Sequence, residues 1–316
     1  MALLFLTLAE PGPLPAYVAT LEPDGRAVSR LVLDSVLEIR RDREWRSGPG
    51  ALGEVADGEV GEGRLAELAV RALRYAQALG GGDANVLAAR LYRYGRRPAS
   101  PSWRRRLGDD IAVARFCGLD GRAVARALDA RFVEAEPRPF WRLWLARGRP
   151  AHSPGRVHKL YLSPVTDALP DVLPDAVDAL GQATALKIGR ELDGILRPDK
   201  AIVYFASLDD LHSAAARLRE RFDGCPAHGV PFTAGITRDG LLSWGIDPPA
   251  SSISRPSWRL WLAHRLAEEL VEARSATVEA RSPTVEPWRA ALARVRLDGV
   301  DTATWVPEAR LFAEGT

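Results

Sequence analysis

The sequence has 316 residues, of which 47% are hydrophobic and 27% are charged. This composition is ordinary for a soluble globular protein, and it excludes disordered, collagen-like and disulfide-scaffold classes. Its 43 basic and 41 acidic side chains leave a net charge of only +2, which argues against a protein that binds nucleic acid through bulk charge.

The N-terminal segment MALLFLTLAEPGPLP has no basic residues before its apolar run, and prolines follow it. We therefore interpret it as a first buried element rather than a signal peptide. No stretch reaches the ~20 apolar residues that span a bilayer. The two cysteines, Cys117 and Cys225, indicate a reducing compartment. We expect a cytoplasmic protein with no membrane partner and no metal site.

Residues 1–150 are expected to form a mainly helical region that contacts a peptide or protein partner. Apolar residues at helical spacing predict a helix over residues 64–79 and a second one over residues 121–132. Between them, PASPSWRRRLG is expected to be a loop that carries Arg104–Arg106.

Residues 151–316 predict a mixed sheet with flanking helices, so the fold class is α+β. The strand-like blocks are VHKLYLS, ATALKIG and KAIVYFA. Ser207 and Asp210 begin a helix, the turn at Asp239-Gly240 indicates a hairpin, and a last helix is expected over residues 257–274. The hexapeptide WRLWLA occurs at 141–146 and again at 258–263, and we expect two tryptophan-rich helices there.

Lysine is rare in this chain. Only Lys159, Lys187 and Lys200 are lysines, and the other 40 basic residues are arginines. A desolvated lysine can lose its proton and act as a base, whereas an arginine cannot. The alternative is that three surface lysines lie close in sequence by chance.

If the three strand-like blocks are neighbours in one sheet, their lysines gather with Tyr161 and with Arg190 or Arg197. Such a cluster suits a phosphate dianion, because cationic hydrogen bonds to phosphate oxygens are strong. The sequence has no GxSxG, P-loop or HExxH motif. His228 precedes Gly229 and Pro231 in a rigid turn, and a functional and a structural role are equally compatible with that position.

The segment from Val157 to about Leu266 carries long specific motifs, namely HKLYLSP, ALKIGRELDGILRPDKAIVYF, HGVPFTAGI, LLSWGIDPP and SWRLWLAHRLAEEL. In these motifs it resembles the HopA-type family, which was named for a plant-pathogen effector and also occurs in gene clusters for thioamitides and class V lanthipeptides. The resemblance implies a phosphoserine/phosphothreonine lyase with an OspF-like core. Such an enzyme eliminates phosphate from a precursor peptide that a separate kinase-like protein has phosphorylated, and leaves dehydroalanine or dehydrobutyrine.

The resemblance also implies roles for individual residues. Lys187 is the base and Lys159 stabilises the enolate. Tyr161 stands where OspF-type lyases have a histidine, so the proton donor is Tyr161, His158 or His228. The available phosphate-binding cations are Lys200, Arg190, Arg197, Arg238 and Arg259. This chemistry requires no cofactor. Two alternatives remain, a non-catalytic module that binds a phosphopeptide or leader peptide for a kinase, and an effector that acts on host signalling proteins.

Overall fold

The computed structural model describes residues 25–41, 43–56, 58–121, 123–136, 139–148, 157–248, 256–279 and 285–312. The chain divides into two compact units, Met1–Glu59 with Glu269–Asp298 and Val60–Glu268 with Gly299–Thr316. The domain boundary predicted at residues 150 and 151 falls inside the second unit. The predicted first buried element lies outside the described residues.

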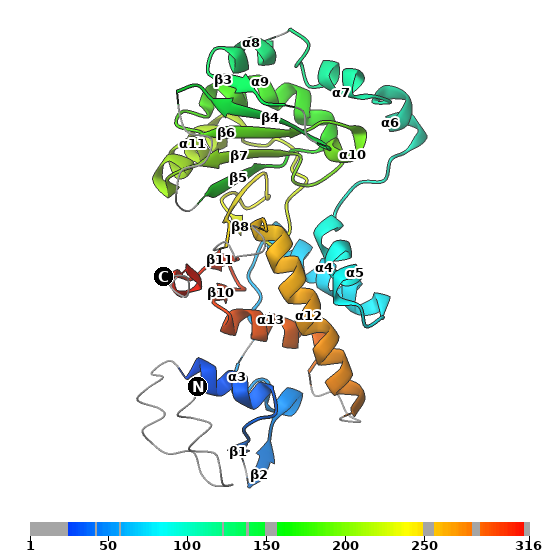
Figure 1. Cartoon of the computed structure of the whole chain (residues 1–316), viewed down its shortest axis with the longest axis vertical. Helices are drawn as coiled ribbons and strands as arrows, with labels where there is room; N and C mark the ends of the chain where they lie inside the picture. The colour runs from blue at the N-terminus through cyan, green and yellow to red at the C-terminus, as the bar shows by residue number, and fades with distance from the viewer. Residues whose placement is uncertain are drawn as a thin grey trace. The chain divides into compact units, whose positions relative to one another are not determined.

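A seven-stranded sheet occupies the second unit, with the strand order β3-β4-β6-β7-β5-β9-β8 (Figure 1). The α+β class is therefore confirmed, and every pair of neighbouring strands is antiparallel where the sequence led us to expect a mixed sheet. Two of its strands, β3 and β4, come from the part of the chain before residue 150. The strands are β3 Phe132–Glu134, β4 Trp141–Ala146, β5 His158–Leu162, β6 Ala185–Gly189, β7 Ala201–Phe205, β8 Ala234–Gly235 and β9 Leu242–Ile246.

Helices make up most of the remaining described chain. The α-helices are α3 Arg26–Leu33, α4 Arg64–Leu79, α5 Ala84–Arg93, α6 Pro101–Arg106, α7 Asp110–Phe116, α8 Ala123–Asp129, α9 Leu169–Ala179, α10 Leu192–Ile195, α11 Leu208–Arg221, α12 Trp258–Glu279 and α13 Pro287–Leu297. Short 3-10 turns cover Gly48–Ala51, Thr166–Ala168 and Ala309–Phe312, and two small hairpins pair β1 Ile39–Arg41 with β2 Glu44–Arg46 and β10 Val300–Asp301 with β11 Val306–Pro307.

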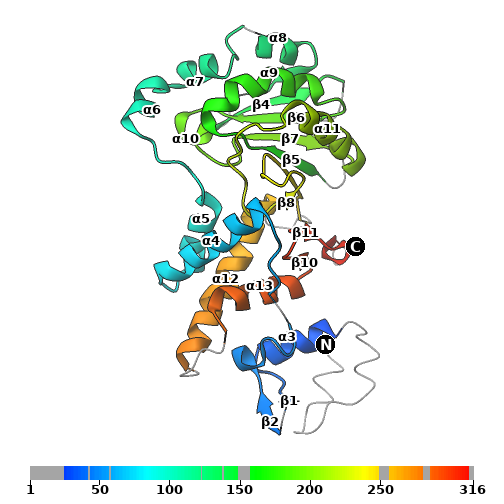
Figure 2. The ribbon, with the colours of Figure 1, turned by 180° about the vertical axis from the view of Figure 1, so that it is seen from behind.

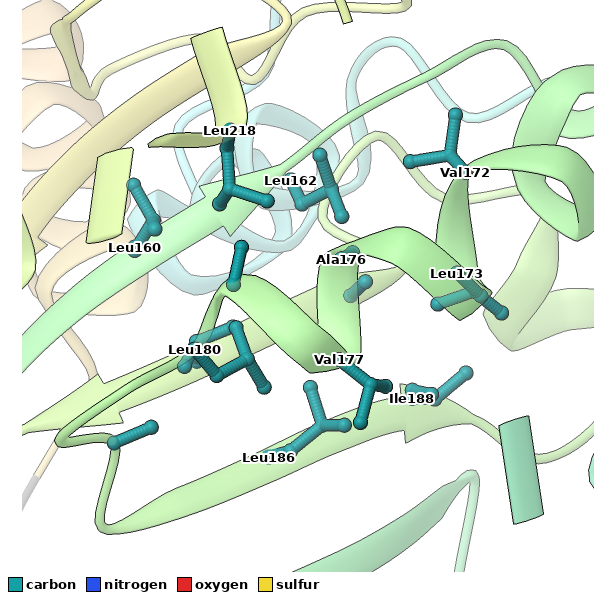
Figure 3. Packing of buried hydrophobic residues seen from close by; sticks show 14 of the residues in the cluster. Leu160, Leu162, Val172, Leu173, Ala176, Val177, Leu180, Leu186, Ile188 and Leu218 are labelled. Atoms are coloured by element: carbon teal, nitrogen blue, oxygen red, sulfur yellow. The ribbon is translucent and has the colours of Figure 1, made fainter. Parts of the chain in front are cut away.

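The main core lies between one face of the sheet and helices α9 and α11 (Figures 1 and 2). Alternate residues of the central strands point into it, because successive side chains of a strand face opposite sides. Figure 3 shows how these strand residues meet the apolar side of α9 and Leu218 of α11. The residues that it labels are Leu160, Leu162, Val172, Leu173, Ala176, Val177, Leu180, Leu186, Ile188 and Leu218.

Several predicted elements are confirmed. The helix over residues 64–79 has the predicted bounds, and the three lysine-bearing blocks are strands β5, β6 and β7. Ser207 caps α11 by accepting a hydrogen bond from the backbone N–H of Asp210 at 3.2 Å. The turn at Asp239-Gly240 joins the antiparallel strands β8 and β9.

Two predictions are wrong. The first WRLWLA copy is strand β4, and only the second begins a helix, α12. The segment with Arg104–Arg106 is helix α6 rather than a loop, because Pro101 opens it and the Ser100 hydroxyl accepts the N–H of Trp103 at 3.2 Å.

Ion pairs around Arg294 of α13 connect the elements of the first unit. Arg294 is 9% exposed and donates to the Asp34 carboxylate at 2.6 Å and to the Leu33 carbonyl oxygen at 2.7 Å. Glu269 lies 3.4 Å from the same guanidinium. Leu33, Leu52, Ala273, Ala290 and Ala293 pack beside this network.

Within the described chain, no helix combines the length and the apolar character that a membrane crossing requires.

Gly189, at the end of β6, provides the first testable prediction. A Cβ atom there would lie 2.5 Å from the carbonyl carbon of Gly194 in α10. Gly189→Ala should therefore destabilise the chain by about 1–3 kcal/mol, as overpacking does in other cores. Urea unfolding followed by circular dichroism measures this change. Gly82→Ala is the matched control, since a Cβ atom there meets nothing within 4 Å, and equal stability of the two variants would contradict the prediction.

Candidate functional site

The register of the central strands places three predicted catalytic residues on one face of the sheet. Lys187 of β6 pairs with Ile202 of β7, which pairs with Tyr161 of β5. In the next row, Lys159 pairs with Tyr204. Lys187 and Tyr161 are two strands apart, about 10 Å between Cα atoms. This face is opposite to the one that packs against α9 and α11.

Lys159 is a nearly buried cation with a carboxylate partner. Its side chain is 7% exposed, and its Nζ atom lies 2.6 Å from the carboxylate of Asp247, just beyond β9. The same Nζ atom lies 5.4 Å from the ring centre of Tyr204. The ion pair with Asp247 and the ring of Tyr204 hold the amino group in place, so Lys159 is placed to act as a fixed cation.

Tyr161 is 1% exposed. Burial raises the pKa of its phenol well above the ordinary value, and the negative charge of Asp247 raises it further. The phenol therefore keeps its proton at neutral pH. It packs with Ile202 and Val230, and its hydroxyl is the polar end of that apolar group.

Lys187 is half-buried beside an aromatic side chain of the neighbouring strand. Its Nζ atom lies 4.2 Å from the ring centre of Trp141 in β4. The guanidinium carbon of Arg197 lies 5.2 Å from the centre of the same ring. Trp141 thus brings two of the predicted site cations to one surface.

Asp199 joins two of the predicted phosphate-binding arginines. Its buried carboxylate accepts hydrogen bonds from Arg197 at 2.8 and 2.9 Å and lies 2.6 Å from Arg259. Burial alone would raise the pKa of Asp199, but the two guanidinium groups hold it well below its usual range. Tyr92 of α5 contacts both arginines, whose guanidinium carbons lie 4.9 and 5.1 Å from its ring centre.

Lys200 and His228 form a separate buried pair. Lys200 is fully buried, and its Nζ atom donates to the Pro164 carbonyl oxygen at 2.8 Å and lies 3.1 Å from His228 Nδ1. His228 Nε2 lies 2.6 Å from the Gly95 carbonyl oxygen, so this nitrogen carries the proton and Nδ1 accepts from the lysine. Burial lowers the pKa of Lys200 to about 7, and burial together with Lys200 lowers the pKa of His228 to about 4.

The remaining predicted site residues are Arg190, Arg238 and His158. Arg190 donates to the Asp110 carboxylate at 2.9 and 3.3 Å, and this hydrogen bond lowers the pKa of Asp110. Arg238 is exposed in the turn between β8 and β9. His158 faces the side of the sheet opposite to Lys159. In the described part of the chain, no group of three or more His, Cys, Asp or Glu residues is arranged to hold a metal ion.

Sequence reasoning missed the two carboxylates and the aromatic residues of this site. Asp199 and Asp247 are the counter-ions of the buried cations, and Trp141, Tyr92 and Tyr204 provide the rings beside them. One signal was present, since a buried cation requires a partner and Asp199 lies next to Lys200 in the sequence. The partner of Lys159 had no such local signal.

The comparisons with known proteins identify structures but no family. No protein-family model matches the sequence, and no curated protein matches it. The chain is similar to the effector protein from Pseudomonas syringae pv. tomato strain DC3000, with 11% identity, a TM-score of 0.43, and coverage of 72% of this chain and 97% of that chain. It is also similar to the effector protein from Pseudomonas syringae pv. syringae strain 61, with 14% identity, a TM-score of 0.36, and coverage of 73% and 99%.

Asp199 predicts a specific sensitivity to acid. Its depressed pKa stabilises the fold above the unfolded-state value near ~3.9, and that contribution is lost as the pH falls further. Asp199→Asn leaves Arg259 buried without its counter-ion and should cost about 3–5 kcal/mol at pH 7. Unfolding measured from pH 7 down to pH ~2 should show a smaller acid-dependent loss in Asp199→Asn than in the wild type. If Asp199→Asn proves as stable as the exposed control Asp178→Asn, Asp199 does not stabilise the fold in this way.

Lys200 predicts a second rise of stability with pH, of the same sign as that of Asp199 but in the alkaline range. Between its folded pKa of about 7 and the unfolded value near ~10.4, the unfolded chain binds more protons, so stability rises as the pH increases. Lys200→Met removes the titrating group and should abolish this rise, which is on the order of a few kcal/mol between pH ~7 and ~10. Urea unfolding at several pH values measures the slope. A slope that is unchanged in Lys200→Met would show that another group causes it.

Proposed function

We propose that this chain is a phosphoserine/phosphothreonine lyase that removes phosphate from a phosphorylated peptide by β-elimination. The observation that carries the proposal is the shared face of β5, β6 and β7, where a fixed cation (Lys159), a protonated phenol (Tyr161) and a second lysine (Lys187) face one side. The motif resemblance described above supports the same reaction.

The reaction needs three functions from these side chains. Neutral Lys187 takes the α-proton of the phosphorylated residue, and the electron pair of the C–H bond passes to the peptide carbonyl as an enolate. This pair then forms the Cα=Cβ bond as the Cβ–O bond breaks, and the phosphate leaves with the electron pair of that Cβ–O bond. Lys159 stabilises the negative charge that develops on the peptide carbonyl oxygen, and such electrostatic stabilisation is often the largest contribution to catalysis.

Among the proton donors considered, Tyr161 is favoured over His228. A histidine with a pKa of about 4 carries no extra proton at neutral pH, and both ring nitrogens of His228 already have protein partners. Tyr161 keeps its proton and lies on the same face as the two lysines.

The exposed fractions of the buried cations favour Arg197 as the residue that binds the phosphate. It is 20% exposed beside Trp141 and Lys187, whereas Arg259 is 2% exposed and Lys200 is fully buried. Arg259 and Asp199 would then hold Arg197 in place. Arg190 and Arg238 remain candidates for contacts with other parts of the peptide.

The substrate in this proposal is a precursor peptide whose serine or threonine has been phosphorylated by a separate kinase-like protein, in the biosynthesis of a lanthipeptide or thioamitide. Purified chain mixed with a phosphothreonine peptide should produce dehydrobutyrine, which mass spectrometry detects as the loss of phosphoric acid. Release of free phosphate together with intact threonine would show a phosphatase and overturn the proposal. Binding of the phosphopeptide without any loss of mass would favour the non-catalytic module.

The variant Lys187→Arg distinguishes the role of Lys187 as a base from its role as a positive charge. Arginine keeps the positive charge but does not release its proton near neutral pH. The variant should lose about 10²–10⁴-fold in turnover while it still binds the phosphopeptide, as calorimetry measures. Arg219→Lys, an exposed exchange on α11, is the control for handling and folding. Near-normal turnover in a folded Lys187→Arg variant would exclude Lys187 as the base.

A further inference from the structure

The position of Lys159 depends on a carboxylate that the reaction scheme has not used. The Lys159 ammonium lies 2.6 Å from Asp247, which is 29% exposed. Among the described residues, the phenols of Tyr161 and Tyr204 share this face with Lys159, and the guanidinium of Arg259 is paired with Asp199. Asp247 is therefore the anion that faces Lys159.

Asp247 is itself held by the first residue of helix α12. The backbone N–H of Trp258 donates to the Asp247 carboxylate at 2.9 Å. One carboxylate thus connects a strand of the sheet to the start of α12. A carboxylate at a helix N-terminus is also favoured by the helix dipole.

Trp258 is placed by close packing on β9. A Cβ atom at Gly245 would lie 2.5 Å from Cδ1 of Trp258, so the indole occupies the space that a side chain would fill. Gly245 lies directly opposite Lys159 in the β5–β9 register. The indole N–H of Trp258 has no hydrogen-bond acceptor among the described residues, and its ring stacks on Trp261 with centres 5.5 Å apart. Packing rather than hydrogen bonding fixes this side chain.

We propose that Asp247 is the positioning residue for Lys159, and that Gly245 and Trp258 fix Asp247 in turn. This inference rests on the proposed lyase function, in which Lys159 must meet a developing enolate oxygen. A displacement of about 1 Å in such a group can reduce the rate roughly 10²-fold. Asp247 touches Lys159 and the backbone of Trp258, and it acts on the reaction through the lysine.

The rarity of lysine allows a direct test of this contact. With three lysines in the chain, selective ¹⁵N-lysine labelling produces at most three side-chain amino signals, which Lys→Arg variants assign. An ion-paired ammonium exchanges its protons with water more slowly than a free one. The Lys159 signal should therefore be visible in the wild type and in Asp247→Glu, and broadened beyond detection in Asp247→Asn. Gly245→Ala, which displaces Trp258, should weaken it.

Kinetics on a phosphothreonine peptide provide the second measurement. Asp247→Asn should lower kcat roughly 10²-fold and leave KM nearly unchanged, because the lysine contributes in the transition state. Asp247→Glu should recover part of the lost kcat because it retains the charge. Asp178→Asn, an exposed exchange on α9, should behave as the wild type in both measurements.

The two measurements separate this inference from the proposed function. A wild-type chain that eliminates no phosphate from any phosphopeptide overturns the lyase function, whereas the ammonium signal still decides whether Asp247 fixes Lys159. Wild-type kcat in Asp247→Asn, or a Lys159 signal that this variant retains, overturns the positioning role. A thermal unfolding curve like that of the wild type shows that any loss in Asp247→Asn is not due to unfolding.

Discussion

Neighbouring residues of β5, β6 and β7 point to opposite faces of one antiparallel sheet, and this alternation controls both the core and the candidate site. Leu160, Leu186 and Val203 face the helices, whereas Lys159, Tyr161 and Lys187 face the other way. A register shift of one residue on any of these strands would exchange the two sets. It would bury lysines among leucines, so the apolar core also determines which polar side chains meet.

The second constraint is the cost of burying charge. Lys159 and Arg259 are almost inaccessible to water, and each has a carboxylate within 2.6 Å. A buried charge is tolerated when it is paired and hydrogen-bonded. Because these cations already have partners, a phosphate that approaches this face competes with carboxylates and gains less from charge alone. The more accessible Arg197, beside Trp141, offers it the better contact.

The sequence predicts the elements whose signals are local. The apolar stripe of α4 and the turn before β9 depend on residues within a few positions, and both are observed. The two WRLWLA copies show where such signals fail. The first copy becomes a strand because β3 and β6 pair with it, and the second becomes a helix because helix-forming residues follow it and Asp247 caps its start.

The candidate site was predictable to the same degree. Rare lysines within strand-like blocks indicated Lys159, Tyr161 and Lys187, and the strands do lie side by side. The ion pair of Lys159 could not be inferred, because its partner lies 88 residues away and reaches it through the pairing of β5 with β9. The pairing of Lys200 with His228 also depends on a loop that returns to the end of β5.

The strand order also determines when the sheet can form during synthesis. β5 does not pair with β6, the next strand in the sequence, but lies between β7 and β9. The chain must therefore be synthesised as far as Ile246 before β5 can pair with both of its neighbours. It must be synthesised as far as Trp258 before Asp247 can accept the hydrogen bond from the start of α12. Contacts between residues so distant in sequence slow folding and leave strand edges open for longer. Until that stage, one edge of β5 is unpaired and Lys159 has no counter-ion, so this strand is open to aggregation or to capture by a chaperone.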